Sequence, residues 1–231
     1  MNYKLKNILA IIVGVLPVNV ILIWYRLTHN EVFSASDMLL YPLIFGGGNI
    51  LLILALNKYL LKGKINDFNS GRGNWYWDIS AGLVLTVICF LCIFIEQATI
   101  APLLPTGKPP SLEVIKLMTD LAKNPVHLAI WLGPVVWIGV ALFEELVRVF
   151  FLKCLWALSN RKSWEYLSIL FVAAFIALAH LYQGAFGIIS VGIQGLLLCL
   201  YYYIFKRIWP LIISHALYDS IQIIMFVIQV S

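Results

Sequence analysis

The chain has 231 residues, of which 62% are hydrophobic and only 12% are charged. A soluble domain is about half apolar and about a quarter charged, so this composition excludes a soluble globular protein and indicates an integral membrane protein. The net charge of +5 is modest, and because the basic residues lie between apolar runs we expect no nucleic-acid partner.

Seven apolar stretches are long enough to cross a membrane, which takes about 20 residues. We therefore predict an all-α, polytopic transmembrane helical bundle that forms one integral membrane domain over residues 1–231. The first stretch has a basic start like a signal peptide, but its apolar core is too long and no cleavage site follows, so we expect a helix that stays in the membrane. In chain order the predicted spans are 7–25, 38–57, 79–103, 128–157, 165–183, 186–205 and 209–230.

Two further features concern the helices themselves. The second span contains "FGGGNI" at 45–50, and three glycines there predict a close approach of another helix. Between the third and fourth spans, Ser111 is a candidate helix cap and apolar residues from Leu112 to Leu121 recur at helical spacing. We expect a short amphipathic helix at the outer membrane surface, with an ordinary packed surface helix as the alternative.

Basic residues gather in alternate gaps between the spans, and lysine and arginine are enriched in cytoplasmic loops. With seven spans, this pattern places the N-terminus in the cytoplasm and the C-terminus outside, in a multi-pass protein of the cell membrane. The four basic clusters are Lys4 and Lys6, then Lys58, Lys62, Lys64 and Arg72, then Arg161 and Lys162, then Lys206 and Arg207.

The cysteines do not suggest a metal or disulfide framework. Cys89 and Cys92 have the C-x-x-C spacing, but they lie in an apolar run and there is no second pair to complete a zinc site. We expect these two cysteines to be small buried hydrophobic residues.

The stretch "ALFEELVRVFFL" at 141–152 places Glu144, Glu145 and Arg148 inside the fourth span. One charge at the centre of a membrane helix costs about 2.5–3.5 kcal/mol on insertion scales, so three need compensation. At helical spacings of three and four residues, Arg148 can neutralise one glutamate. The other carboxylate is left for a proton, a metal, a water or another partner.

Two other spans carry polar groups at membrane depth. His180 lies in "FIALAHLYQG" in the fifth span, and His215 and Asp219 lie four residues apart in "PLIISHALYDS" in the seventh. Each alone could serve packing or hydrogen bonding. Polar groups at membrane depth are energetically costly in each of these three spans, and one shared polar site would explain all of them. We therefore predict that these groups converge with the fourth-span carboxylates in one site. Counted from the cytoplasmic ends, His215 comes out shallower than Glu144, which a tilted last helix would reconcile.

Two kinds of chemistry fit such a site. His180 and His215 with a carboxylate could bind a metal such as zinc and leave a position for water. Without a metal, a carboxylate can act as general base while a histidine orients water or stabilises an oxyanion. The chain has no H-E-x-x-H motif and no serine or cysteine in an evident nucleophile context. The favoured hypothesis is therefore a water activated by a carboxylate, which indicates a hydrolase.

The ordered set resembles the CPBP intramembrane proteases, the family of the Rce1-type CAAX prenyl endopeptidases and many bacterial Abi-type proteins. Its pattern is a Glu-Glu pair followed by Arg, then a His after an apolar run with Phe, then a His with Asn or Asp four residues later. The resemblance covers about residues 128–225. The matching residues are Glu144, Glu145 and Arg148, then Phe175 and His180, then His215 and Asp219.

The resemblance implies an intramembrane endopeptidase in which Glu144 is the general base on the attacking water and His180 assists it. His215 and Asp219 would complete the site. The implied substrate is a hydrophobic or lipidated peptide presented at the lipid membrane. Whether a divalent metal takes part stays open. The alternatives are a catalytically silent scaffold or immunity protein of the same family, and a proton-coupled transporter, although the chain shows no paired halves.

This sequence departs from the family pattern at two of its supporting positions. The family pattern has three residues between the Glu pair and the Arg, whereas here only two separate Glu145 from Arg148. Arg148 therefore falls about 100° earlier around the helix. The family Phe lies four residues before the His, whereas Phe175 lies five before His180 and Ile176 takes the expected place. Glu145 and Arg148 are expected to have supporting roles.

Overall fold

The computed structural model describes residues 2–28, 39–104, 119–121, 123–180 and 183–230. Over these residues the elements are all helices, which confirms the predicted class. They are α1 (Tyr3–Gly14), α2 (Leu16–Thr28), the π-helix η1 (Pro42–Gly46), α4 (Gly47–Ala55), the π-helix η2 (Leu56–Leu60), the 3₁₀ helix η3 (Ile65–Phe68), α5 (Trp75–Thr99), the 3₁₀ helix η4 (Ala101–Leu103), α7 (Pro125–Ile130), the π-helix η5 (Trp131–Leu142), α8 (Phe143–Trp156), α9 (Lys162–Leu178), α10 (Gly184–Phe205) and α11 (Trp209–Val230).

Six helical stretches in the described part of the chain are long and apolar enough to cross a membrane, one fewer than predicted. The predicted span 165–183 corresponds to α9, which has 17 residues and is therefore only about 26 Å long, short of the ~30 Å hydrocarbon core. The six stretches are Tyr3–Ile21, Leu39–Leu60, Trp75–Leu103, Pro125–Trp156, Gly184–Phe205 and Trp209–Gln229. The predicted interfacial helix falls almost wholly outside the described residues.

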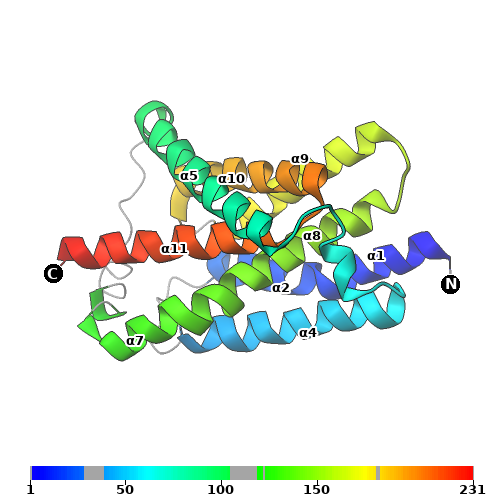
Figure 1. Cartoon of the computed structure of the whole chain (residues 1–231), viewed down its shortest axis with the longest axis horizontal. Coiled ribbons are helices and arrows are strands. Elements are labelled where there is room, and N and C mark those ends of the chain that lie inside the picture. Colours follow the sequence, from blue (N-terminus) through cyan, green and yellow to red (C-terminus); the bar gives the residue numbers. More distant parts are fainter. Residues whose placement is uncertain (1, 29–38, 105–118, 122, 181–182, 231) are drawn as a thin grey trace.

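The helices form an elongated bundle with the chain termini at opposite ends (Figure 1). Helix α5 crosses α11 obliquely, and α11 also contacts η5. Helices α9 and α10 lie side by side. Helix α8 contacts α1, α4, α9, α10 and η5, and every side chain from Glu145 to Leu152 is buried. A charge within this buried stretch of α8 must therefore find its partner inside the protein.

Close helix approach depends on glycine at two crossings. A β-carbon on Gly46 would lie 2.6 Å from the Gly139 carbonyl oxygen, so η1 and η5 meet where neither residue has a side chain. This confirms the close approach predicted from "FGGGNI", although it falls on the first glycine alone. At the other crossing, a β-carbon on Gly82 of α5 would lie 2.7 Å from Cγ2 of Ile213 on α11.

The predicted span 128–157 is not one regular helix. Gly133 has non-helical torsions (φ −91°, ψ −109°), and Pro134 follows it inside η5. Proline removes a backbone donor and kinks a helix, which explains the break. The chain runs as a π-helix from Trp131 to Leu142 and returns to an α-helix at Phe143, one residue before Glu144. Such π-segments are frequent at functional sites.

The cysteine prediction is confirmed in its main point. Cys89, Cys154 and Cys199 are buried, Cys92 is half-buried, and all four are free thiols. They are helix residues of the apolar core or its edge, which agrees with a role as small hydrophobic side chains.

Candidate active site

The three ionisable residues of α8 divide into a pair and a single carboxylate. Glu145 is completely buried and Arg148 is 3% exposed. The Arg148 Nη1 group donates a hydrogen bond to Oε1 of Glu145, across the three-residue helical spacing. The side chain of Glu144 is 24% exposed and takes no part in that pair. Arg148 thus neutralises Glu145 and leaves Glu144 as the spare carboxylate that the helical spacing required.

A histidine from α11 joins this pair. Nδ1 of His215 lies 2.8 Å from Oε1 of Glu145, so one oxygen accepts from both the histidine and Arg148. An ionised carboxylate can only accept, so Nδ1 carries the hydrogen of this bond. The contact joins α8 to α11 at one depth, which removes the difference in depth expected from counting residues.

The other nitrogen of His215 faces two more carboxylates. Nε2 lies 3.6 Å from Oδ2 of Asp219 and 4.0 Å from Oε2 of Glu144. Both distances exceed a hydrogen bond but are short enough for a direct electrostatic interaction. His215 therefore lies between the paired glutamate on one side and two acceptor carboxylates on the other.

Glu144 and His180 line the same small pocket, which has a volume of about 30 Å³. A volume of this size holds a water molecule, and polar groups on its wall give that water its partners. The pocket joins α8 to the end of α9 and to α2. The other lining residues are Asn19, Phe143, Val147, Ile176 and Ala179.

His180 lies in the turn that follows α9, one residue past the helix cap at Ala179. Its Nδ1 lies 3.2 Å from the carbonyl oxygen of Ile176. Because a carbonyl only accepts, Nδ1 is the protonated nitrogen in this contact. The sequence placed His180 inside a span, whereas the structure places it where the helix ends.

The two departures from the family pattern have visible consequences. Ile176, which stands at the position expected for Phe, lines the pocket beside Glu144. Phe175 points elsewhere and packs edge-on against Phe151, with ring centroids 5.6 Å apart. The early position of Arg148 still allows the contact with Glu145.

The residues of the site do not fit a metal ion as they are placed. The histidines, cysteines, aspartates and glutamates of the described ranges include no group of three or more positioned to hold one. His180 and His215 approach Glu144 from different elements, and Glu145 is occupied by Arg148. The prediction of a metalloprotease with His180 and His215 as ligands is therefore not supported by this geometry.

Two polar residues near these elements were missed in the sequence. Asn19 of α2 is 7% exposed, lines the Glu144 pocket and donates through Nδ2 to the carbonyl of Val15 at 2.8 Å. Glu96 of α5 is 3% exposed, and within the described chain neither of its carboxylate oxygens has a hydrogen-bond partner. A polar residue inside an apolar run was the signal in both cases, as it was for Glu144.

Fold and site together define a polytopic helical membrane protein with a buried cluster of carboxylates and imidazoles. Residues 126–221 match the family model of the type II CAAX prenyl endopeptidase Rce1-like proteins. This segment is therefore similar to the Rce1-like family, which agrees with the resemblance found over residues 128–225. Comparison with curated proteins and with solved structures gave no match.

Proposed function

We propose that the protein is an intramembrane endopeptidase of the CAAX prenyl protease type that hydrolyses a peptide bond with a water activated by Glu144. The observation that carries the proposal is the division of the two glutamates. Glu145 is buried and engaged by Arg148 and His215, whereas Glu144 is partly exposed beside a water-sized pocket that His180 also lines. A general base needs both an unengaged lone pair and a place for its water.

Glu144 removes a proton from the water in this pocket, and the resulting hydroxide oxygen bonds to the scissile carbonyl carbon. His180 assists by hydrogen bonding to the water or to the developing oxyanion. The tetrahedral intermediate then breaks its C–N bond, and the proton held by Glu144 passes to the leaving amine. Each step uses only the water, the peptide and these two side chains.

His215 and Asp219 complete the site by controlling the charge around Glu144. The Nε2 side of His215 faces Glu144 and Asp219 at 4.0 and 3.6 Å, while its Nδ1 is held by Glu145. This arrangement fixes the ring and presents Nε2 to the reacting groups. Glu145 acts as a positioning residue because it reaches the reaction through His215.

The substrate class follows from the family and the location of the site. The Rce1-like match supports a peptide whose C-terminal region is lipidated or otherwise held in the membrane. Glu144, His215 and Asp219 lie on helical stretches long and apolar enough to cross a bilayer, so a substrate must approach through lipid or from the membrane surface. No observation in the described chain favours the silent scaffold or the proton-coupled transporter.

The test uses purified full-length protein in detergent with internally quenched CAAX peptides, farnesylated and unmodified. Glu144→Gln and His180→Ala are each expected to reduce cleavage by a factor of about 10²–10⁴, the usual share of general acid–base catalysis. Retained cleavage by purified Glu144→Gln protein would overturn the mechanism.

Glu165→Gln is the matched control for removal of a carboxylate. Glu165 lies in the first turn of α9 and accepts a hydrogen bond from the Tyr203 hydroxyl at 3.1 Å, away from the pocket of Glu144. Its replacement is expected to leave cleavage within twofold or so of the unmodified protein, since no reacting group contacts it. An equal loss in both variants would assign the effect to folding.

A further inference from the structure

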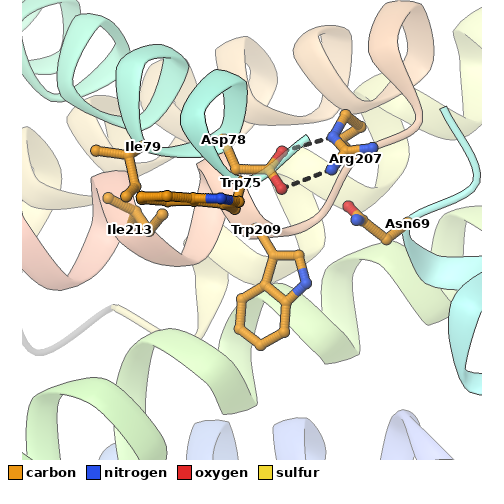
Figure 2. Close-up of a pocket in the computed structure, with 7 residues that line it drawn as sticks. All are labelled: Asn69, Trp75, Asp78, Ile79, Arg207, Trp209 and Ile213. Atoms are coloured by element: carbon orange, nitrogen blue, oxygen red, sulfur yellow. Dashed lines mark hydrogen bonds and ion pairs between the residues drawn. The ribbon is translucent and has the colours of Figure 1, made fainter. Parts of the chain in front are cut away.

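A second and larger pocket lies between the first turns of α5 and α11 (Figure 2). Its volume of about 370 Å³ is within the range of small-molecule sites and far exceeds that of the Glu144 pocket. Figure 2 shows two indole rings, two isoleucines and an amide around a buried ion pair. The lining residues are Asn69, Trp75, Asp78, Ile79, Arg207, Trp209 and Ile213.

The two helices make this pocket by diverging from a close crossing. Gly82 of α5 contacts Ile213 of α11 so tightly that a β-carbon would lie 2.7 Å from Cγ2. One turn before Gly82, the side chains of Asp78 and Ile79 face the opening between the helices. The crossing closes the inner end of the pocket, and the outer end opens where the helices begin.

An ion pair forms the polar end of the pocket. Asp78 and Arg207 are each 5% exposed. Nε and Nη2 of Arg207 donate to the two oxygens of Asp78 at 2.5 and 2.6 Å, and Nη1 donates to the carbonyl of Gly71 at 2.8 Å. The hydrogen bonds with Asp78 raise the pKa of Arg207, so the guanidinium stays charged.

Hydrogen-bond donors exceed acceptors in this pocket. A guanidinium has five N–H groups, and three of those on Arg207 are used within the described chain. The indole N–H groups of Trp75 and Trp209 have no acceptor among the described residues. Asn69 uses its oxygen to accept from the Ile208 amide at 3.1 Å, which leaves its NH₂ group facing the site. A ligand with several acceptor oxygens suits such a surface.

The two tryptophans of the pocket indicate that it lies at the level of the membrane surface. Trp75 and Trp209 are the first residues of two of the stretches long enough to span a bilayer, and tryptophan is enriched at the interface. Their side chains are 60% and 49% exposed on the outside of the bundle. Ile79 is 41% exposed, so the apolar wall continues onto the surface that lipid chains cover.

This pocket is separate from the candidate active site. On α11, Ile213 faces α5, whereas His215, two residues later and about 200° around the helix, contacts Glu145 of α8. The two sites therefore occupy opposite faces of α11, and a ligand in one does not enter the other.

We propose that the pocket binds a membrane phospholipid, with the phosphodiester at Arg207 and an acyl chain along the groove between α5 and α11. The phosphate oxygens accept from the two remaining N–H groups of Arg207 and from the indoles of Trp75 and Trp209. The chain lies against Ile79 and Ile213. Because Asp78 already neutralises the guanidinium, recognition depends on donor geometry together with apolar contact, and both parts of the lipid are required.

The experiment measures lipid binding to the full-length protein in detergent by native mass spectrometry. Dioleoylphosphatidylglycerol is the probe, and dioleoylglycerol has the same two acyl chains but lacks the phosphoglycerol headgroup. Ile79→Trp fills the pocket, and Leu83→Trp adds the same ring one turn further along α5, outside the lining. We expect about tenfold weaker binding of the phospholipid to Ile79→Trp and unchanged binding to Leu83→Trp. Dioleoylglycerol should bind the unmodified protein about tenfold more weakly.

A second pair of variants keeps the test decisive if the added ring disturbs folding. Trp209→Leu removes one donor and one wall, and Trp77→Leu removes a neighbouring tryptophan that does not line the pocket. Only Trp209→Leu should weaken phospholipid binding. Equal binding by both members of either pair, or equal binding of the two lipids, would overturn the proposal. Displacement of the lipid by millimolar inorganic phosphate would also overturn it, because the ligand would then be a soluble phosphate compound.

Discussion

Two arginine–carboxylate pairs buried in the described part of the chain differ in how the chain forms them. Glu145 and Arg148 are three residues apart on one helix, and a histidine from α11 shares the carboxylate. Asp78 and Arg207 are 129 residues apart and join the start of α5 to the connection between α10 and α11. The first pair is formed as soon as its helix forms, whereas the second exists only when the whole bundle is assembled.

The two pairs also differ in what they leave over. The Glu145 pair lies beside a spare carboxylate, Glu144, and a pocket large enough for water. The Asp78 pair neutralises both of its charges and leaves two N–H groups of Arg207 as hydrogen-bond donors. An unpaired charge at membrane depth costs free energy and indicates a catalytic site. Unused hydrogen-bond donors on a neutralised ion pair indicate a ligand-binding site instead. The predictions below test this distinction.

The largest expected effect separates Glu144 from Glu145. Glu144→Gln should reduce cleavage by about 10²–10⁴ and leave the thermal unfolding temperature nearly unchanged, because no buried partner loses its contact. Glu145→Gln should instead destabilise the protein by roughly 3–5 kcal/mol, because Arg148 then stays buried without a charged partner. Cleavage assays and thermal unfolding in detergent provide the two measurements. If both variants lost cleavage and stability to the same extent, Glu144 and Glu145 would not have separate roles.

The next effect concerns the long-range pair. Asp78→Asn should destabilise the protein by about 1.5–3 kcal/mol, the usual value of hydrogen bonds to a charged group. The loss is smaller than for Glu145 because water in the adjoining pocket can reach Arg207. The double variant Asp78→Leu with Arg207→Met should recover part of that loss, since neither charge is then left alone. Thermal unfolding of the single and double variants measures both values. A double variant less stable than the single one would contradict this reading.

Glu96 offers a change in the opposite direction. Its carboxylate is buried in α5 and, within the described chain, has no hydrogen-bond partner. Glu96→Leu should therefore stabilise the protein by about 1–3 kcal/mol, because the desolvation cost of the carboxyl group is removed. A raised unfolding temperature supports this assignment. A lowered unfolding temperature would show that Glu96 has a partner in the folded protein.

The smallest expected effect is that of a chelator. The described residues include no group of three metal-binding side chains, and the proposed mechanism uses only Glu144, His180 and water. Incubation with EDTA followed by removal of the chelator should leave the cleavage rate unchanged. Loss of cleavage that zinc restores would replace the carboxylate-only mechanism with a metal-assisted one.

The sequence alone determined the class of the protein and the members of its candidate site. Composition and apolar length identified a helical membrane protein, and the cost of intramembrane charge singled out Glu144, Glu145, Arg148, His180, His215 and Asp219. The helical spacings of four and three residues also predicted that Arg148 contacts one of the two glutamates, because neighbours within one helix turn are fixed by the helix itself.

Only the tertiary structure decided which glutamate Arg148 neutralises and which pocket the other one faces. It also ended α9 before His180, broke the helix at Gly133 and brought Arg207, which the sequence presented only as a topology signal, to Asp78. The physical reason is the separation along the chain over which each kind of interaction acts. Helical periodicity fixes relations over three or four residues, whereas relative depth, rotation and crossing of helices depend on side-chain packing between segments far apart in the chain.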